Sequence, residues 1–360
     1  MTDAAGDIPL FSRAPALAGT VAHLPLGTYP SRVDRLVVHD AGEQIPILVK
    51  RDDVAAAGYA GNKVRKLEFI LADARRRGMT RLITAGATGS HHAFATAYHG
   101  RQTGFDVSLV LFPQSITPHV REMLLLDAAV GAELFWARRM ETVPYGLWRA
   151  RFVHRRQAAC IVPPGGSSEI GTYGYINGAL ELAAQIEAGA AERPSRIHVA
   201  AGTLGTVAGM AIGLAWAGLD IPIVATRITA RLLTNERMLA SLVRSTLARL
   251  HGAGAIDAPD AAAVLAGVTL RHDQIGAGYG RATPAGTHAT QAFANAGLRL
   301  DATYTAKAAA SLLADAAQED ARSGLPLFWH TLSATAPRDL IGSVAAAELP
   351  RPFARYLGAL

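Results

Sequence analysis

The chain of 360 residues contains a single cysteine, Cys160, and no long apolar run. One cysteine cannot form an intrachain disulfide, and it excludes a metal cluster built on several thiolates. No apolar stretch reaches the roughly 18 residues that span a bilayer, and the N-terminus has neither the basic segment nor the apolar core of a secretory signal. From these absences we expect a cytoplasmic protein with no membrane partner.

Aromatic residues are also scarce, at 6% of the chain, and much of the basic excess behind the net charge of +6 is arginine. The basic runs, such as 75–77 and 155–156, show neither interleaved aromatics nor a recognisable nucleic-acid-binding module. We therefore expect no nucleic-acid partner. The charge is interpreted as a solvated surface with a mild preference for anionic ligands.

The chain is rich in apolar strands that alternate with Ala/Leu-rich helices. Strands are expected at 45–50, 82–86, 107–112, 132–136, 161–163, 196–200, 221–228 and 268–271. Helices are expected at 67–77, 93–103, 120–130, 174–190, 207–217 and 232–250. This alternation predicts an α/β fold of parallel sheets with helices on both faces. The length suffices for two domains, and since no Pro/Ser-rich linker separates them, one domain is expected to be inserted in the other.

A short cationic turn at Gly61-Asn62-Lys63 carries the clearest chemical signal. It delivers Lys63 to the first turn of a predicted helix, where the helix dipole and neighbouring cations push an ammonium toward the neutral amine. A neutral lysine is a nucleophile for aldehydes, which is the chemistry of Schiff-base enzymes. The alternative is a solvated turn that opens a surface helix.

Two loops that follow predicted strands could bind anions, because ligands of parallel α/β sheets bind outside the carboxyl ends of strands. Loop 85–92 brings Ser90 and two imidazoles to a helix N-terminus, where backbone amides can hold an anion; a serine cap with exposed histidines is the alternative. No third ligand accompanies the two histidines, so no metal site is expected. Loop 200–209 suits a phosphate, but it is neither a nucleoside-triphosphate loop nor a dinucleotide fingerprint.

Four further features are open to two interpretations each. The turn at 164–168 could face a cofactor or be a tight connection, and the hydroxyl of Thr331 could bond a ring nitrogen or cap a helix. Tyr279 lies in a glycine-rich loop and Tyr304 lies just before a helix. Either phenol could act on a substrate or be a packed ring with a bonded hydroxyl.

Taken together, these segments resemble the pyridoxal-phosphate enzymes of the tryptophan-synthase-β fold, fold type II. The closer resemblance is to the D-cysteine desulfhydrase and 1-aminocyclopropane-1-carboxylate deaminase branch, in order from about Ile47 to Thr331. The segments that carry it are Lys50-Arg51-Asp52-Asp53, Gly61-Asn62-Lys63-x-Arg65-Lys66-Leu67-Glu68, Gly165-Gly166-Ser167-Ser168, loop 202–206, Gly278-Tyr279-Gly280, Tyr304 before Lys307, and His330-Thr331. The resemblance implies a two-domain α/β fold with open twisted sheets: a large cofactor-binding domain from 1–60 and 165–360, and a smaller inserted domain from 61–164.

The resemblance also assigns roles to individual residues. It implies pyridoxal 5′-phosphate as the cofactor, with Lys63, and not Lys66, as the lysine that forms the Schiff base. Ser90 would hold the substrate carboxylate, and Tyr279 and Tyr304 would be the active-site tyrosines. The residues implied to contact the cofactor are Lys63, Asn62, His91, Gly202, Thr203, Leu204, Gly205, Thr206 and Thr331.

The chain departs from the family pattern at four places. His91 replaces the usual asparagine beside the cofactor's ring oxygen, and Ala302 replaces a proline before the second tyrosine. Thr88-Gly89 replaces Ile-Gln, and Leu332-Ser333 replaces Gly-Gly. Since these changes surround the substrate and the ring while the lysine motif is intact, we expect cofactor binding to be retained and the substrate to be the open question.

The expected activity is that of a lyase or deaminase on a small amino acid, with β-elimination of D-cysteine-like substrates to a 2-oxo acid and ammonia foremost. Ring-opening deamination, elimination from cysteate, β-replacement, racemisation and cofactor binding without turnover are the alternatives. A homodimer is expected from the resemblance alone.

Overall fold

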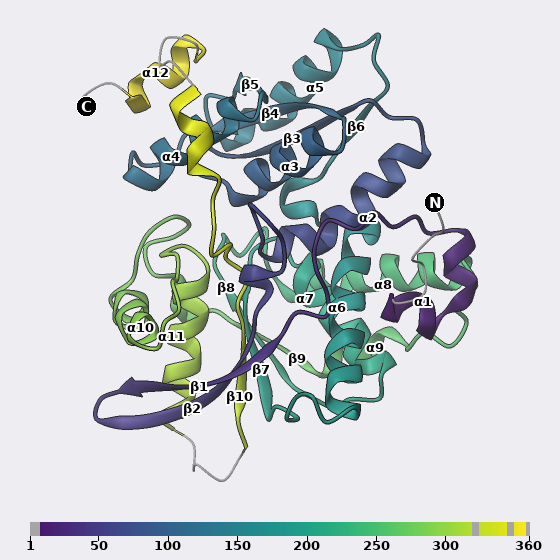
Figure 1. The fold of residues 1–360 in the computed structure, drawn as a ribbon, viewed down its shortest axis with the longest axis vertical. Helices are drawn as coiled ribbons and strands as arrows, with labels where there is room; N and C mark the ends of the chain where they lie inside the picture. The colour runs from purple at the N-terminus through teal and green to yellow at the C-terminus, as the bar shows by residue number, and fades with distance from the viewer. Residues whose placement is uncertain (1–7, 319–323, 344–348, 358–360) are drawn as a thin grey trace.

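The computed structural model describes residues 8–318, 324–343 and 349–357, and it contains two β-sheets (Figure 1). The strands are β1 Val33–Asp40, β2 Glu43–Lys50, β3 Arg81–Ala87, β4 Asp106–Phe112, β5 Glu133–Trp136, β6 Ala159–Ile161, β7 Arg196–Ala201, β8 Ile223–Arg227, β9 Val268–Arg271 and β10 Pro326–Trp329. The larger sheet has the order β1-β2-β10-β7-β8-β9, and the smaller has β5-β4-β3-β6. All neighbouring strands are parallel except the β1–β2 hairpin.

Helices cover both faces of each sheet, as the alternating pattern predicts. The α-helices of the described residues are α1 Pro9–Arg13, α2 Asn62–Arg76, α3 His91–Gln102, α4 Pro118–Ala129, α5 Val143–Val153, α6 Glu169–Glu187, α7 Gly205–Trp216, α8 Glu236–Gly252, α9 Ala261–Ala266, α10 Pro284–Asn295, α11 Thr305–Ala316 and α12 Arg351–Leu357. One face of the larger sheet packs on α6–α9, and the other packs on α10 and α11 (Figure 1). The smaller sheet lies between α2–α4 on one side and α5 on the other.

The fold-class prediction is confirmed, and the differences are local. Strands buried on both faces, such as β3, read as continuous apolar runs and are found where expected. Strand β1 is not anticipated, because its side chains are mostly half-buried or exposed and give no continuous apolar run. The segment 253–275 holds the short helix α9 as well as the expected strand. Among the described residues, no helix combines the length and apolarity needed to cross a membrane.

The strands are distributed in a way that bears on the domain boundaries. Every strand of the smaller sheet lies within 61–164, and those of the larger sheet lie before and after it. However, Phe353 and Tyr356 of α12 belong to the apolar cluster of the smaller sheet, and α2 packs against both α6 and α3. The domain boundaries at 61 and 164 therefore stay a prediction. If each sheet with the helices that pack on it is called a lobe, the C-terminal helix α12 belongs to the smaller lobe.

Candidate active site

The candidate site lies where strands of both sheets reach their carboxyl ends. Loop 202–206 follows β7 and segment 330–333 follows β10, while loop 88–90 follows β3 and turn 163–168 follows β6. A contact connects the ends of the two sheets here, since the backbone amide of Gly205, after β7, donates to the hydroxyl of Ser167, after β6, at 3.1 Å. This is the place in an α/β fold where ligands bind.

Lys63 lies in the first turn of α2, as predicted, and a close backbone contact fixes that turn. Gly61 precedes the helix with a φ of 88°, and a Cβ there would lie 2.6 Å from the carbonyl oxygen of Thr331. The amide of Asn62 donates to the same carbonyl at 3.1 Å. Only glycine fits this approach, so the turn brings Lys63 beside Thr331 although 268 positions separate them in the sequence.

The surroundings of the Lys63 amine favour its neutral form. Its Nζ donates to Asn62 Oδ1 at 2.9 Å. Burial lowers the pKa of Lys63 to about 8, and the negative charge of Asp301 opposes that shift. The expectation of a readily neutralised amine agrees with this pKa, although the main cause is burial rather than the helix dipole and neighbouring cations.

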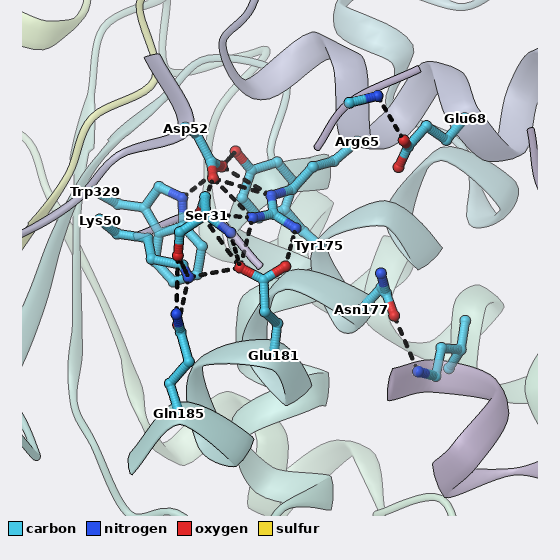
Figure 2. Close-up of polar contacts among 12 residues, drawn as sticks. Ser31, Lys50, Asp52, Arg65, Glu68, Tyr175, Asn177, Glu181, Gln185 and Trp329 are labelled. Atoms are coloured by element: carbon cyan, nitrogen blue, oxygen red, sulfur yellow. Dashed lines mark hydrogen bonds and ion pairs between the residues drawn. The ribbon is translucent and has the colours of Figure 1, made fainter. Parts of the chain in front are cut away.

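A buried network of opposite charges anchors the helix that carries Lys63 (Figure 2). Arg65, two residues along α2, donates to Asp52 at 2.8 Å and to Glu181 of α6 at 2.9 Å. Lys50, at the end of β2, donates to Glu181 at 2.6 Å. These four side chains are at most 3% exposed and their formal charges cancel.

Hydrogen bonds complete this network around Asp52. Its carboxylate also accepts from the hydroxyls of Ser31 at 2.9 Å and Tyr175 at 2.7 Å, and from Trp329 Nε1 at 2.7 Å. Burial alone would raise the pKa of Asp52, but Arg65 outweighs it and holds the pKa below its ordinary value. The Lys50–Asp53 motif of the resemblance thus has a positioning role, because through Asp52 it ties β2 and β10 to the start of α2.

Loop 202–206 has the features of a phosphate cradle. Leu204 adopts a left-handed conformation with φ 67°, and α7 begins at Gly205, so first-turn amides face out of the helix. A Cβ at Gly205 would lie 2.6 Å from Ser167 Oγ. Thr203 lies 2.7 Å from the Ser167 hydroxyl, and Thr206 accepts from the Asn62 side chain at 3.2 Å. The turn at 164–168 therefore contacts this loop, and Asn62 connects it to Lys63.

Lys66 also faces this cradle, a contact that the sequence did not reveal. It is 2% exposed, and its Nζ donates to the Gly165 carbonyl at 3.0 Å and lies 3.5 Å from Ser167 Oγ. A Cβ on Gly205 would lie 3.1 Å from this Nζ. Within the described ranges no carboxylate pairs with Lys66, and burial and Lys63 lower its pKa. A buried amine beside a helix N-terminus is a fitting partner for a phosphate dianion.

Ser90 and His91 begin α3 on the smaller lobe. Ser90 caps the helix by accepting from Ala93 at 3.2 Å, so the capping interpretation of this serine is confirmed. The expected exposure of the two histidines is wrong, because His91 is half-buried and His92 is buried. His91 Nδ1 lies 2.6 Å from the hydroxyl of Tyr59, a residue that no sequence motif singled out.

The two predicted tyrosines meet on the larger lobe. The hydroxyls of Tyr279 and Tyr304 lie 2.7 Å apart, and burial raises the pKa of both phenols. Asp301 accepts from the amide of Tyr304 at 2.8 Å and holds the start of α11. Lys307, one turn further along α11, donates to the carbonyls of Ile275 and Gly278 at 2.8 and 3.2 Å. Helix α11 therefore holds the Tyr279 loop through Tyr304 and through Lys307.

A chain of contacts thus links most of the predicted residues. Thr331 and Asn62 adjoin Lys63, and Asn62 reaches loop 202–206. The Tyr304 ring lies against that loop, since a Cβ on Gly202 would be 3.5 Å from it. Ser90 and His91 stand across from these residues on the smaller lobe, joined to the segment before α2 by Tyr59. The described residues do not group three or more His, Cys, Asp or Glu side chains in a way that could hold a metal ion.

These donors fit pyridoxal phosphate. The helix amides, the threonine hydroxyls and Lys66, which has no carboxylate partner among the described residues, suit a phosphate. An amine with a lowered pKa suits an aldehyde. Two α/β lobes with these groups at their strand ends define an enzyme of the fold type II pyridoxal-phosphate class.

Comparisons with known proteins give the family. The family model described as pyridoxal-phosphate dependent enzyme matches residues 27–325, so the chain belongs to this family. It is 33% identical to nocardicin C-9′ epimerase of Nocardia uniformis subsp. tsuyamanensis over 91% of this chain and 97% of the relative. It is 32% identical to D-cysteine desulfhydrase of Salmonella typhi over 90% of this chain and 96% of the relative. A crystal structure of an ACC deaminase homologue matches with a TM-score of 0.73 and 27% identity, covering 94% of this chain and all of that one. The predictions of a pyridoxal-phosphate cofactor and of a lyase or deaminase are confirmed.

Proposed function

We propose that the protein catalyses β-elimination on a small amino acid of the D-cysteine type, releasing a 2-oxo acid and ammonia. The observation that carries the proposal is the lowered pKa of Lys63 beside the cradle formed by loop 202–206 and Lys66. The bound cofactor supplies an electron sink for the negative charge that develops at the substrate's α-carbon. The similarity to D-cysteine desulfhydrase over most of both chains supports this substrate class.

In this proposal the protein's own groups divide the work. Lys63 would hold the cofactor, and its free amine would remove the α-proton of the substrate, for which a pKa near 8 is suited. Ser90 and the amides at the start of α3 bind the substrate carboxylate. The protonated pair Tyr279 and Tyr304 faces the β-substituent and donates a proton to the leaving thiolate. The Thr331 hydroxyl, which carries no charge, would leave the cofactor's ring nitrogen largely unprotonated and so favour elimination over transamination.

Epimerisation at the α-carbon is a second candidate, because the similarity to nocardicin C-9′ epimerase is as extensive as that to the desulfhydrase. Epimerisation returns a proton to the face opposite the one from which it was removed. The half-buried tyrosine pair offers a protonated group besides Lys63 that could supply it.

One pair of assays separates the two candidates. The purified holoenzyme is incubated with D-cysteine while pyruvate and sulfide are measured, and with a series of amino acids in D₂O while deuterium at the α-carbon and inversion are followed. We expect both elimination products from D-cysteine, and neither from Lys63→Ala. Deuterium incorporation with inversion and no 2-oxo acid would reject elimination in favour of epimerisation.

We further propose that the protein is a homodimer and that α5 lies in its interface. Tyr145, Trp148 and Phe152 are 64, 58 and 52% exposed, and their rings stack in a row at 5.8 and 5.4 Å. Ile161, 47% exposed, is on β6, the edge strand of the same sheet that α5 covers. Exposed aromatic rows of this kind are typical of interfaces. The cytoplasmic location expected from the sequence stays a prediction.

A further inference from the structure

The Tyr59 side chain is held rigidly against His91. Tyr59 is 3% exposed, and its ring packs edge-on against Phe94 at 4.6 Å. Its backbone carbonyl lies 2.9 Å from Nε2 of His99, one helical turn and a half beyond Phe94 on α3. Its hydroxyl lies 2.6 Å from Nδ1 of His91, the first residue of the same helix. Both the backbone carbonyl and the hydroxyl of Tyr59 are therefore held by α3, the helix that carries His91.

The protons in this contact can be assigned from its surroundings. Burial raises the pKa of Tyr59, so the phenol keeps its hydrogen, and among the described residues His91 Nδ1 is its hydrogen-bond partner. Burial, reinforced by His119 and Lys63, lowers the pKa of His91 to about 3, so this ring is neutral. A neutral imidazole carries one N–H, and the ring nitrogen that accepts a hydrogen bond cannot be the one that carries the hydrogen. The N–H of His91 is therefore on Nε2.

We propose that Tyr59 locks His91 in the Nε2–H tautomer and so makes His91 a fixed hydrogen-bond donor toward the cofactor's ring oxygen. This inference rests on the proposed function, since the resemblance places that oxygen beside His91. The family's asparagine amide always has N–H groups to donate, whereas a histidine presents a donor or an acceptor according to its tautomer. By fixing the tautomer, Tyr59 gives His91 the N–H donor that the asparagine of the family has in its side-chain amide.

The charged groups around His91 do not offer another way to fix the tautomer. The His119 ring lies at 4.8 Å from that of His91, but its Nε2 faces the Gly89 carbonyl at 3.1 Å. Asp301 acts on His91 only through its charge, and its oxygens are occupied by the amides at the start of α11. Lys63 and Arg299 act as like charges that oppose protonation. Tyr59 is therefore a positioning residue, which acts through His91.

The tautomer can be read directly, without cofactor. Protein labelled with ¹⁵N-histidine is studied by long-range ¹H–¹⁵N spectra, and His91→Asn identifies the His91 signals among the 12 histidines. We expect a pyridine-type shift for Nδ1 and a pyrrole-type shift for Nε2. In Tyr59→Phe the two shifts should move toward each other as both tautomers become populated. A pyrrole-type Nδ1 in the wild type would overturn the inference, whatever the variant does.

A second readout uses binding of the cofactor. Tyr59→Phe should weaken pyridoxal phosphate binding, followed by its visible absorbance, by about tenfold, the loss of one hydrogen bond to a charged oxygen. Tyr98→Phe is the matched control, because Tyr98 packs on the same Phe94 but makes no hydrogen bond to His91. Equal effects of the two variants would overturn the inference. If the wild type bound no cofactor at all, the proposed function would fail while the tautomer measurement still decided the role of Tyr59.

Discussion

Among the single residues of the site, Lys63 has a lowered pKa because it is buried. A lysine with its ordinary pKa is almost wholly protonated at neutral pH, whereas a pKa of about 8 leaves about a tenth of Lys63 neutral at pH 7. Sequence reasoning found Lys63 from the glycine and asparagine that precede it. It did not identify Lys66, which is one turn further along the same helix. A lysine that faces a phosphate site and a surface lysine have the same sequence signature, and only the folded chain brings loop 202–206 close to Lys66.

The lowered pKa of Lys63 predicts a particular pH dependence for its reaction with an aldehyde. The neutral amine is the reactive form, so the capture rate should rise about tenfold per pH unit below pH 8 and level off above it. Pyridoxal is the suitable probe, because it brings no phosphate charge to the site. The rate is measured by absorbance on the cofactor-free protein, with Lys63→Ala as the control. A profile that still rises steeply between pH 9 and 10 would contradict the assignment.

At the scale of elements, α2 is the part that joins the site to the fold. Its amphipathic pattern predicted the helix, and the apolar runs predicted the strands on which it packs. The pattern could not show that Arg65 pairs with Glu181, since 116 positions separate them and a charged residue in a helix usually faces solvent. Likewise, the basic run at 155–156 was expected to lack aromatic neighbours, yet Arg155 lies over the Phe152 ring at 4.9 Å.

The buried network makes a prediction about stability. Arg65→Met leaves the buried Asp52 without its cation and Glu181 with Lys50 alone, so one buried negative charge is no longer balanced. We expect a loss of about 3–5 kcal/mol in the free energy of unfolding. Urea unfolding measures this loss, and Arg75→Met on the exposed part of the same helix should change stability by less than about 0.5 kcal/mol. A loss at Arg65 no larger than at Arg75 would mean that the network does not anchor α2.

The hydrogen bonds from Lys307 of α11 to the Tyr279 loop lead to another prediction. Lys307→Met removes the ammonium that bridges the carbonyls of Ile275 and Gly278, so the loop should open more often. Trypsin should then cut faster after Arg281, which is exposed at the end of that loop, while the thermal unfolding midpoint stays close to that of the wild type. Tyr304→Phe, which leaves Lys307 in place, is the comparison. Unchanged cleavage in Lys307→Met would show that the ammonium does not hold the loop.

For the molecule as a whole, the alternation of strands and helices predicted the fold class, and the motifs in their order along the chain carried the resemblance to the family. What could not be predicted is how the two lobes contribute jointly. Tyr59 and His91 are 32 positions apart, and Ser167 and Gly205 are 38 positions apart. These pairs meet only in the folded chain, and no local pattern encodes them.

The aromatic row on α5 allows a test of the proposed homodimer. Trp148→Glu places a charge in the middle of the row, and desolvating it would be costly in an interface. We expect the variant to be monomeric in sedimentation at concentrations where the wild type is dimeric. Val54→Glu, at another exposed apolar side chain, should leave the association state unchanged. A dimeric Trp148→Glu would place the interface elsewhere.

We propose that Lys63 holds pyridoxal phosphate, with the phosphate group at loop 202–206. Borohydride reduction of the cofactor-loaded protein, followed by mass spectrometry of the peptide that carries the added mass, tests this proposal. We expect the label on Lys63 in the wild type, and its absence in Lys63→Ala. A label on Lys66, or none anywhere in the chain, would show that Lys63 does not hold the cofactor.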